Sequence, residues 1–274
     1  MGGKLYVVGT PIGNLGDMSP RALEVLRSAA LIAAEDTRVS LKLLRHFGIE
    51  TPLVSYHEHN KRERGEHLLA RISAGEACAI ITDAGMPCIS DPGEDLVALC
   101  AEAGVEVVAV PGPSAAISAL AISGLPTGRF AFEGFLSVRK SSRNEHLEQV
   151  KNDRRTLIFY EAPHKLISTL ADMLAAFGDR RIALAREITK LHEEVIRTTL
   201  SAAVKYYEEK SPRGEYVLII EGAPEAPAPE MPTLEAAITM ARELVAAGEQ
   251  VSQAAKVIAK QTGHSRKDIY TGLH

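Results

Sequence analysis

The first ordered pattern of the chain is Leu5-Tyr-Val-Val-Gly-Thr-Pro-Ile-Gly-Asn-Leu-Gly-Asp17. Its first four residues are apolar and partly β-branched, as expected for a buried strand. The loop that follows is rich in glycine, and Ser19-Pro20 then marks the beginning of a helix. A strand that passes through a tight turn into a helix is typical of α/β architecture.

The same alternation continues through the first half of the chain. After the strand at 5–8, further strands are predicted at 31–34, 53–55, 77–82 and 105–110. Helices are predicted at 21–27, 39–46, 61–73, 94–103 and 114–122. Apolar strands that alternate with helices predict a mostly parallel sheet covered on both faces.

The second half has a different texture. The turn-rich segment 123–129 predicts a linker between an N-terminal α/β domain over 1–122 and a C-terminal α/β domain over 130–222. Strands are predicted at 130–134, 156–160, 181–185, 194–199 and 216–221, and helices at 144–152, 164–177 and 201–209. Because two strands follow one another without a helix between them, the second sheet is predicted to be mixed.

The C-terminal part of the chain contains no strand pattern. Residues 223–232 are rich in proline and predict an extended tether, and 233–274 predict a small helical extension. Within it, residues 252–270 have the spacing of a helix, a glycine-containing turn and a second helix. This pattern is consistent with a helix-turn-helix that presents Arg266 and Lys267 to nucleic acid, and equally with a helical cap or a dimer contact.

Bulk properties exclude several classes of protein. The chain has 274 residues, and its longest apolar runs are far shorter than the about 20 residues that a membrane helix needs. No signal-peptide pattern precedes the first strand. The three cysteines, Cys78, Cys88 and Cys100, lack metal-binding spacing and are predicted to be free thiols in a reducing compartment. We therefore expect a cytoplasmic protein that is not associated with a membrane.

The glycine-rich loop does not match the common nucleotide-binding patterns. Its glycines are Gly9, Gly13 and Gly16, whereas a dinucleotide-binding loop has the pattern G-x-G-x-x-G. Pro11 also lacks the amide that would face a pyrophosphate. The sequence contains no Walker A Lys-Ser/Thr pair either. The loop therefore predicts close backbone approach to a ligand that carries no phosphate chain.

Two more loops rich in glycine and proline follow strands at the same predicted edge, at 82–93 and 111–115. In an open α/β sheet, ligands bind beyond the carboxyl ends of the strands. Three such loops together predict a pocket with many backbone groups, suited to an adenosine with a methionine arm. Each loop taken singly is also compatible with a plain connection.

Six ordered motifs in the first half, together with four in the second, resemble the tetrapyrrole methylase family, and within it the branch that methylates ribosomal RNA. Those of the first half are Gly9-Thr-Pro-Ile-Gly-Asn14, Ala34-Glu-Asp-Thr-Arg38, Ser55-Tyr-His-Glu-His-Asn60, Asp83-Ala-Gly-Met-Pro87, Ser90-Asp-Pro-Gly93 and Pro111-Gly-Pro-Ser-Ala115. Those of the second half are Phe159-Tyr-Glu-Ala-Pro-His-Lys165, Arg186-Glu-Ile-Thr-Lys190, His192-Glu-Glu194 and Gly214-Glu-Tyr216. The resemblance covers residues 5–222 nearly without gaps.

The resemblance implies two α/β domains that hold S-adenosylmethionine between them, in a homodimer. It also implies that the substrate is the ribose 2′-hydroxyl of a cytidine in the decoding region of 16S ribosomal RNA. The residues that it places around the cofactor are Pro11, Gly85, Met86, Ile89, Ser114, Ala115, Tyr160 and Glu187. The chain has Gly85-Met-Pro87 where precorrin-type relatives have Gly-Asp-Pro, which favours the ribosomal branch.

A ribose hydroxyl is a weak nucleophile, so a proton acceptor is expected near the ligand. The candidates are the acidic residues Glu35, Asp36 and Glu161 at predicted strand ends. Asp36 is equally suited to capping the next helix, and Glu161 to being a polar strand end. His57 and His59 would share one side of a strand, but no third ligand is evident, so no metal site is expected.

Net charge is −4, so RNA binding needs a local basic patch. Residues 139–165 carry seven basic and four acidic side chains, an excess of three that a solvated helix face also shows. From this segment and the loops, the predicted RNA contacts are Arg38, Arg139, Lys140, Arg143 and Lys165. Two other functions are weighed against RNA methylation: a small-molecule methylase acting on a tetrapyrrole, and a non-catalytic RNA-binding assembly module.

Overall fold

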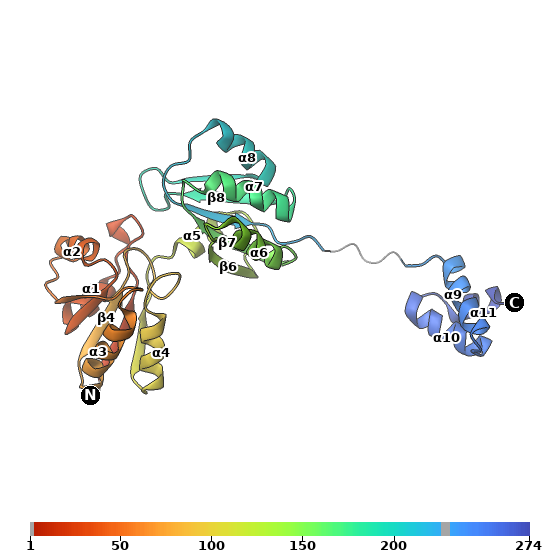
Figure 1. Cartoon of the computed structure of the whole chain (residues 1–274), viewed down its shortest axis with the longest axis horizontal. Helices are drawn as coiled ribbons and strands as arrows, with labels where there is room; N and C mark the ends of the chain where they lie inside the picture. Colours follow the sequence, from red (N-terminus) through yellow and green to blue (C-terminus); the bar gives the residue numbers. More distant parts are fainter. Residues whose placement is uncertain (1–2, 226–230) are drawn as a thin grey trace. The chain divides into compact units, whose positions relative to one another are not determined.

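The computed structural model describes residues 3–225 and 231–274. It divides into two compact units, Met1–Ala223 and Pro224–His274, which we describe separately (Figure 1). Of the predicted proline-rich tether, residues 226–230 lie outside the described residues.

The first sheet of unit 1 is built from the N-terminal half of the chain. Its strands are β1 (Lys4–Val8), β2 (Leu31–Ala34), β3 (Leu53–Ser55), β4 (Ala77–Ile81) and β5 (Glu106–Val110). They are ordered β3-β2-β4-β1-β5, and every pair is parallel. The prediction of a mostly parallel sheet is confirmed.

Helices cover both faces of this sheet, as Figure 1 shows. They are α1 (Pro20–Ser28), α2 (Thr37–His46), α3 (Lys61–Ser73) and α4 (Glu94–Glu102), with a short 3-10 turn, η1 (Leu15–Asp17), before α1. Alternate residues of β1 separate the two layers, because strand side chains point to opposite faces. Leu5 packs with Leu68 of α3, whereas Val8 packs with Leu26 of α1.

The second sheet follows from the C-terminal half of unit 1. Its strands are β6 (Phe130–Phe135), β7 (Thr156–Glu161), β8 (Arg181–Arg186), β9 (Glu194–Thr199) and β10 (Tyr216–Ile220). They are ordered β6-β7-β10-β8-β9; β6 and β7 are parallel and the other pairs are antiparallel. The predicted mixed sheet is confirmed. Helices α6 (Lys140–Val150), α7 (Leu166–Phe177) and α8 (Leu200–Glu209) cover one face.

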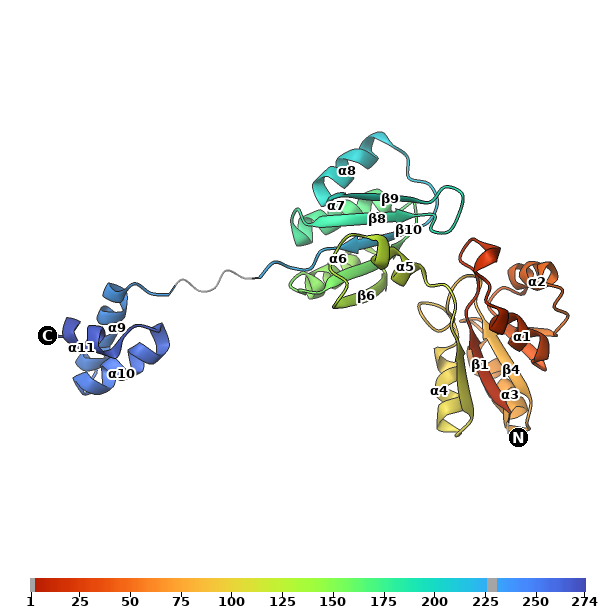
Figure 2. The same cartoon turned by 180° about the vertical axis from the view of Figure 1, so that it is seen from behind.

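The opposite face of the second sheet is covered by α5 (Ala115–Ile122), which contacts β7 and β10 (Figure 2). Ala119 and Leu120 of this helix are buried against Ile158 and Ile219. Helix α5 therefore follows the last strand of the first sheet in the sequence but packs on the second. It joins the two halves into one unit, although the sequence placed it in the N-terminal domain.

Helix α6 begins at Lys140, four residues before the predicted start at Asn144. The polar run 140–146 obscures the helical period in the sequence, but Arg143 and Leu147 lie one turn apart on the buried side of the helix. The difference changes the environment of Arg143.

Unit 2 contains α9 (Leu234–Ala246), α10 (Val251–Thr262) and α11 (Arg266–Gly272) around a small core that includes Ala241, Ile258 and Ile269. Gly263 ends α10 with φ +73°, and Ser265 caps α11. The predicted helix, turn and helix are present, with Arg266 and Lys267 exposed at the start of α11.

Two further properties of the described chain bear on its class. Within residues 3–225 and 231–274, no helix combines the length and the apolar character that a membrane crossing demands. Cys78 and Cys100 are buried free thiols, and Cys88 is partly buried.

Candidate active site

A cavity of about 550 Å³ lies within unit 1, where loops after the strands of both sheets meet. Its volume falls within the about 300–1,000 Å³ of small-molecule sites. The first sheet contributes residues that follow β1, β2, β4 and β5, and the second contributes residues around β6, β7, β8 and β10. Its lining consists of Ile12, Glu35, Asp83, Ala84, Gly85, Met86, Ile89, Ser90, Asp91, Ser114, Ala115, Phe135, Tyr160, Glu161, Ala162, Pro163, Glu187, Ile188, Lys190, Glu215, Tyr216 and Val217.

Close backbone contacts hold the loops of the first sheet together at this cavity. The Thr10 amide donates to the Gly85 carbonyl at 2.9 Å, and the Gly85 amide donates to the Thr10 carbonyl at 3.1 Å. A Cβ added to Gly9 would lie 2.7 Å from the Sδ of Met86. Gly85 has a φ of +88°, a conformation that favours glycine, so the turn that meets the loop after β1 depends on this residue.

Three carboxylates of the first sheet line the cavity, and none of them has a basic side chain within ion-pair distance in the described part of the chain: Glu35, Asp83 and Asp91. The charge of Arg38 acts on Asp83 from farther away. The Thr82 hydroxyl donates to Glu35 at 2.8 Å. Burial, followed by the negative charge of Glu35, raises the pKa of Asp91 to about 6. Burial also raises the pKa of Asp83. This side of the cavity is an environment in which a cation is favourable and a phosphate is not.

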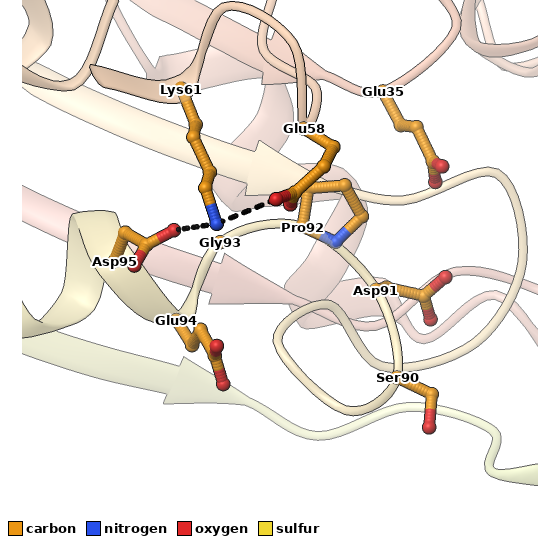
Figure 3. Close-up of a pocket in the computed structure, with 9 residues that line it drawn as sticks. All are labelled: Glu35, Glu58, Lys61, Ser90, Asp91, Pro92, Gly93, Glu94 and Asp95. Atoms are coloured by element: carbon orange, nitrogen blue, oxygen red, sulfur yellow. Dashed lines mark ion pairs between the residues drawn. The ribbon is translucent and has the colours of Figure 1, made fainter. Parts of the chain in front are cut away.

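A second, smaller cavity of about 350 Å³ adjoins the first and shares Glu35, Ser90 and Asp91 with it (Figure 3). In it, the Lys61 ammonium lies 2.9 Å from Glu58 and 2.8 Å from Asp95. Figure 3 shows that this ion-paired cluster is separate from the side chains of Glu35 and Asp91.

The second sheet contributes a clasp around Lys190, formed by the carboxylates of Glu187 and Glu215. The Lys190 ammonium lies 2.9 Å from Glu187 and 2.8 Å from Glu215, and a Cβ on Gly13 would lie 2.4 Å from the Cγ of Lys190. Glu187 has a positive φ of 51°. Hydrogen bonds from Lys190 and the Glu215 amide outweigh burial and lower the pKa of Glu187.

Glu161, at the end of β7, is 2% exposed and fully hydrogen-bonded. It accepts from the Thr169 hydroxyl at 2.5 Å and the Ala162 amide at 2.8 Å, and it pairs with Lys165 at 3.0 Å. These contacts fix the turn from β7 into α7, which forms part of the cavity wall.

A family model described as tetrapyrrole (corrin/porphyrin) methylases matches residues 4–204. The chain belongs to this family. It is 48% identical over 269 residues to "Ribosomal RNA small subunit methyltransferase I" of Synechocystis, covering 98% of this chain and 96% of that protein. The protein of the same name from Thermotoga maritima is 48% identical over 220 residues, covering 80% of this chain and 99% of its own length. The resemblance seen in the motifs is confirmed.

Solved structures of other proteins show the same fold. Diphthine synthase matches with a TM-score of 0.60 and 15% identity, over 80% of this chain and 90% of its own. The uroporphyrin-III-C-methyltransferase of Thermus thermophilus matches with a TM-score of 0.57 and 21% identity, over 80% of this chain and 94% of its own.

The structure brings most of the residues expected around the cofactor to one cavity. Those that line it are Gly85, Met86, Ile89, Ser114, Ala115, Tyr160 and Glu187. Pro11 is buried and is not part of the lining. The Ala116 amide donates to the Tyr160 hydroxyl at 3.2 Å, which ties α5 to β7.

The three acidic candidates have different environments. Glu35 and Glu161 line the cavity, whereas Asp36 does not. Asp36 caps α2, and its carboxylate pairs with Arg38 at 2.7 Å, which lowers its pKa to about 2. Sequence reasoning missed Asp91, although its motif Ser90-Asp-Pro-Gly93 was noted.

The basic residues expected to contact RNA also have different environments. Arg139 and Lys140 are exposed, and Arg38 is exposed beside Asp36. Lys165 is held by Glu161. Arg143, by contrast, is 7% exposed and its guanidinium lies 2.6 Å from Asp172. Arg143 is therefore a structural residue of α6 and is not available to a phosphate.

Methylases of this family use S-adenosylmethionine as methyl donor. The cavity fits it on three counts: glycine backbone at close approach, an apolar wall that includes Met86 and Ile89, and carboxylates that offset positive charge. Met86 stands where precorrin-type relatives have an aspartate, and the cavity that it lines also contains the carboxylates of Asp83 and Asp91. Among the described residues, no group of three or more His, Cys, Asp or Glu could hold a metal.

Proposed function

We propose that the chain transfers a methyl group from S-adenosylmethionine to a ribose 2′-hydroxyl of 16S ribosomal RNA. The target is a cytidine in the decoding region of the small ribosomal subunit, and the enzyme acts as a homodimer in the cytoplasm. The observation that carries the proposal is the cavity itself, where glycine loops and unpaired carboxylates form a site for a cationic donor. Relatives at 41–48% identity carry the name of a small-subunit ribosomal RNA methyltransferase.

When bound, S-adenosylmethionine supplies a methyl group on a positively charged sulfur. The residues proposed to hold it are Gly85, Met86, Ile89, Ser114, Ala115, Tyr160 and Glu187. Catalysis of such a displacement depends mainly on alignment of the reacting groups, so a rigid cradle is the main contribution of the protein. The contact between Thr10 and Gly85 and the clasp around Lys190 supply that rigidity from the two sides.

The attacking hydroxyl needs an acceptor for its proton, a contribution of about 10²–10⁴ in rate. Of the acidic candidates, Asp36 is committed to Arg38 and Glu161 to Lys165 and Thr169. Glu35 remains, and its neighbour Asp91 lines the same two cavities. We propose that Asp91 accepts this proton, because its pKa of about 6 suits an acceptor at neutral pH. The negative charge of Glu35 contributes to that raised pKa.

RNA reaches the site as a single-stranded or flipped-out nucleotide, because a ribose in a packed helix cannot be aligned with the methyl group. Exposed Arg139 and Lys140 contact phosphates and contribute affinity rather than sequence choice. Arg38 and, in unit 2, Arg266 and Lys267 are further phosphate contacts in this proposal, each exposed in the structure.

Methyl-labelled S-adenosylmethionine tests the proposal with two acceptors, small ribosomal subunits and a precorrin-type tetrapyrrole. The expected result is label in RNA, recovered after nuclease digestion as a dinucleotide that resists cleavage because its 2′-oxygen is methylated. Label only in the tetrapyrrole would replace the proposal with a small-molecule methylase. Donor binding without transfer to either acceptor would indicate a non-catalytic RNA-binding module.

A further inference from the structure

We propose that Phe135 is a stacking platform that positions the base of the target nucleotide at the mouth of the cavity. The inference rests on the proposed function and deepens it, since it names how the RNA is held beside the donor. It predicts a substrate whose base is unpaired and free to stack on an aromatic ring, with no requirement for a particular base at this contact.

An irregularity in β6 directs Phe135 toward the cavity. Phe132 pairs with Ile158 and Phe135 pairs with Tyr160, so three residues of β6 span two residues of β7. The register shift lies between Phe132 and Gly134, and Gly134 has a φ of +64°. In a regular strand, residues three apart point to opposite faces. The bulge therefore places the rings of Phe132 and Phe135 on the same face.

Ring contacts confirm this arrangement. Tyr160 lies 5.0 Å from Phe132 and 5.3 Å from Phe135, measured between ring centroids. Phe132 is part of the core beneath α5, but Phe135 lines the cavity and is 55% exposed. Tyr160 contacts the ring, the Lys165 ammonium lies 5.9 Å from its centroid, and more than half of the residue is still exposed.

An exposed ring at this position is unfavourable unless something covers it. Burial of a phenylalanine ring stabilises a fold, but here the residue stays more than half exposed to water. A nucleobase has the flat apolar face that would cover it, and bases stack favourably on aromatic side chains. The strand thus keeps an apolar surface free where a flipped base would enter.

A basic side chain lies beside the ring, paired at 3.0 Å with Glu161. The Lys165 ammonium lies 5.9 Å from the centroid of Phe135, while the unpaired carboxylates Glu35, Asp83 and Asp91 follow strands of the other sheet. A cationic donor is favoured beside those carboxylates. Phe135 is also only four residues before Arg139, so their Cα atoms are within about 14 Å, and the proposed phosphate contacts begin beside the platform.

The bulge also brings β6 against the loop that carries Asp91. A Cβ on Gly134 would lie 3.2 Å from the Oγ of Ser90, the residue before Asp91. The platform and the proposed proton acceptor are thus parts of one contact between the two sheets. A base stacked on Phe135 places its own ribose near that loop.

The test compares Phe135→Leu with Phe135→Trp, and uses Phe130→Leu as the matched control. Phe130 lies on the same strand and is 39% exposed, but it does not line the cavity. Methyl transfer to small subunits is measured at saturating donor. We expect Phe135→Leu to raise the KM for the subunit by about 5–160-fold, the equivalent of one stacked base. Phe135→Trp should keep the KM close to that of the wild type, because tryptophan also offers a flat ring. Phe130→Leu should leave the KM unchanged.

Two binding measurements separate the possible outcomes. The Kd for S-adenosylmethionine should be unchanged in Phe135→Leu, and a weaker Kd with an unchanged subunit KM would overturn the proposal by assigning the ring to the donor. Binding of an oligoribonucleotide that carries 2-aminopurine reports stacking directly through its fluorescence. If the wild-type protein transferred no methyl group to RNA, the proposed function would fail, and this second measurement would still decide the platform. Equal fluorescence changes for wild type and Phe135→Leu would overturn it.

Discussion

Gly9 and Gly112 lie backbone against backbone, so that a Cβ added to Gly112 would be 2.7 Å from the Cα of Gly9. The reverse distance, from a Cβ on Gly9 to the Cα of Gly112, is 2.6 Å. These residues follow β1 and β5, which are neighbours in the first sheet. The contact fixes the spacing of two of the loops that form the candidate active site.

Gly112→Ala should therefore disrupt the site and weaken the fold. Because the obstructing atoms are backbone, the added methyl group can be relieved only by moving one loop, at a cost of about 1–3 kcal/mol. We expect a matching loss in the free energy of unfolding, measured by urea denaturation, and a Kd for S-adenosylmethionine weakened at least tenfold. Gly128→Ala is the control, because no atom lies within 4 Å of the Cβ position of Gly128. A Gly112→Ala variant with native stability and native donor affinity would contradict the described contact.

We expect substitution of Glu161 to lower the free energy of unfolding, because its role is mainly structural. Glu161→Ala leaves the largely buried Lys165 without its partner, and breaking a buried ion pair costs about 3–5 kcal/mol. Glu161→Gln keeps one carbonyl oxygen as acceptor for the Ala162 amide, and its NH2 group can donate to the Thr169 hydroxyl in place of the lost acceptor. It should therefore lose less, about 1–3 kcal/mol. Glu148→Ala, in an exposed pair with Lys151, should change the free energy of unfolding by less than about 1 kcal/mol. A fully stable but inactive Glu161→Gln would instead support the role of proton acceptor.

Much of the fold follows from local sequence patterns. The apolar strands and their alternation with helices were enough to predict both sheets. The spacing of apolar residues differs clearly between strands and helices where one face is buried. The β9 bounds, Glu194–Thr199, agree with the predicted ones. Helix α5 was predicted within the N-terminal domain, and it packs on the second sheet; its apolar sequence has no polar face to show which layer it covers. Such packing is decided by tertiary contacts that a single sequence does not contain.

The candidate site was only partly predictable for a related reason. Motifs identified the loops, and most residues that they named line one cavity. The environment of Asp91 depends on burial and on Glu35, which is 56 positions away in the sequence, so no local pattern reveals it. Phe135 points to the cavity because of a bulge, and Arg143 is buried because α6 starts early. Each of these depends on the register of one element.

The exposed basic residues before and at the start of α6 should control the salt dependence of RNA binding. Each phosphate contact contributes about 0.7–0.9 to the slope of log Kd against log salt. We expect the double variant Arg139→Ala/Lys140→Ala to reduce that slope by about 1.5 without changing stability, because both side chains are exposed. Arg143→Ala should leave the salt slope unchanged and destabilise the protein. Removing the partner of Asp172 should cost about 3–5 kcal/mol of folding free energy. An unchanged slope in the double variant would remove these residues from the RNA contact.

Removal of residues 224–274 should leave unit 1 folded and able to bind the donor. All four large apolar clusters lie in unit 1, and the small core of unit 2 contains residues of unit 2 alone. We expect an unchanged unfolding midpoint for the shortened chain and an unchanged Kd for S-adenosylmethionine. If α10 and α11 bind nucleic acid, the KM for the small subunit rises, and Arg266→Ala/Lys267→Ala in the full chain reproduces part of the rise. A shortened chain that unfolds at lower temperature would show that unit 2 acts as a cap.

Asp91 should make the protein less stable as pH rises. Its pKa is about 6 in the fold against an ordinary value of 3.8, so between these values the folded state binds more protons than the unfolded state. The free energy of unfolding therefore falls as pH increases from about 4 to about 6, and this contribution is constant above that range. Asp91→Asn removes the buried charge and should stabilise the protein at pH 8 by about 1–2 kcal/mol, after allowance for solvent screening. The gain should disappear below pH 4.

The same variant separates stability from catalysis. Without the carboxylate, kcat for methyl transfer should fall by about 10²–10⁴-fold, and the acid limb of the wild-type pH profile near pH 6 should be lost. Asp95→Asn is the matched control, since its carboxylate pairs with Lys61 at 2.8 Å and its removal should bring no gain in stability at pH 8. If Asp91→Asn is more stable at pH 8 but keeps its kcat, the buried charge is real and the proton acceptor is Glu35. If it shows no pH-dependent gain, the carboxylate of Asp91 is better solvated than the structure indicates.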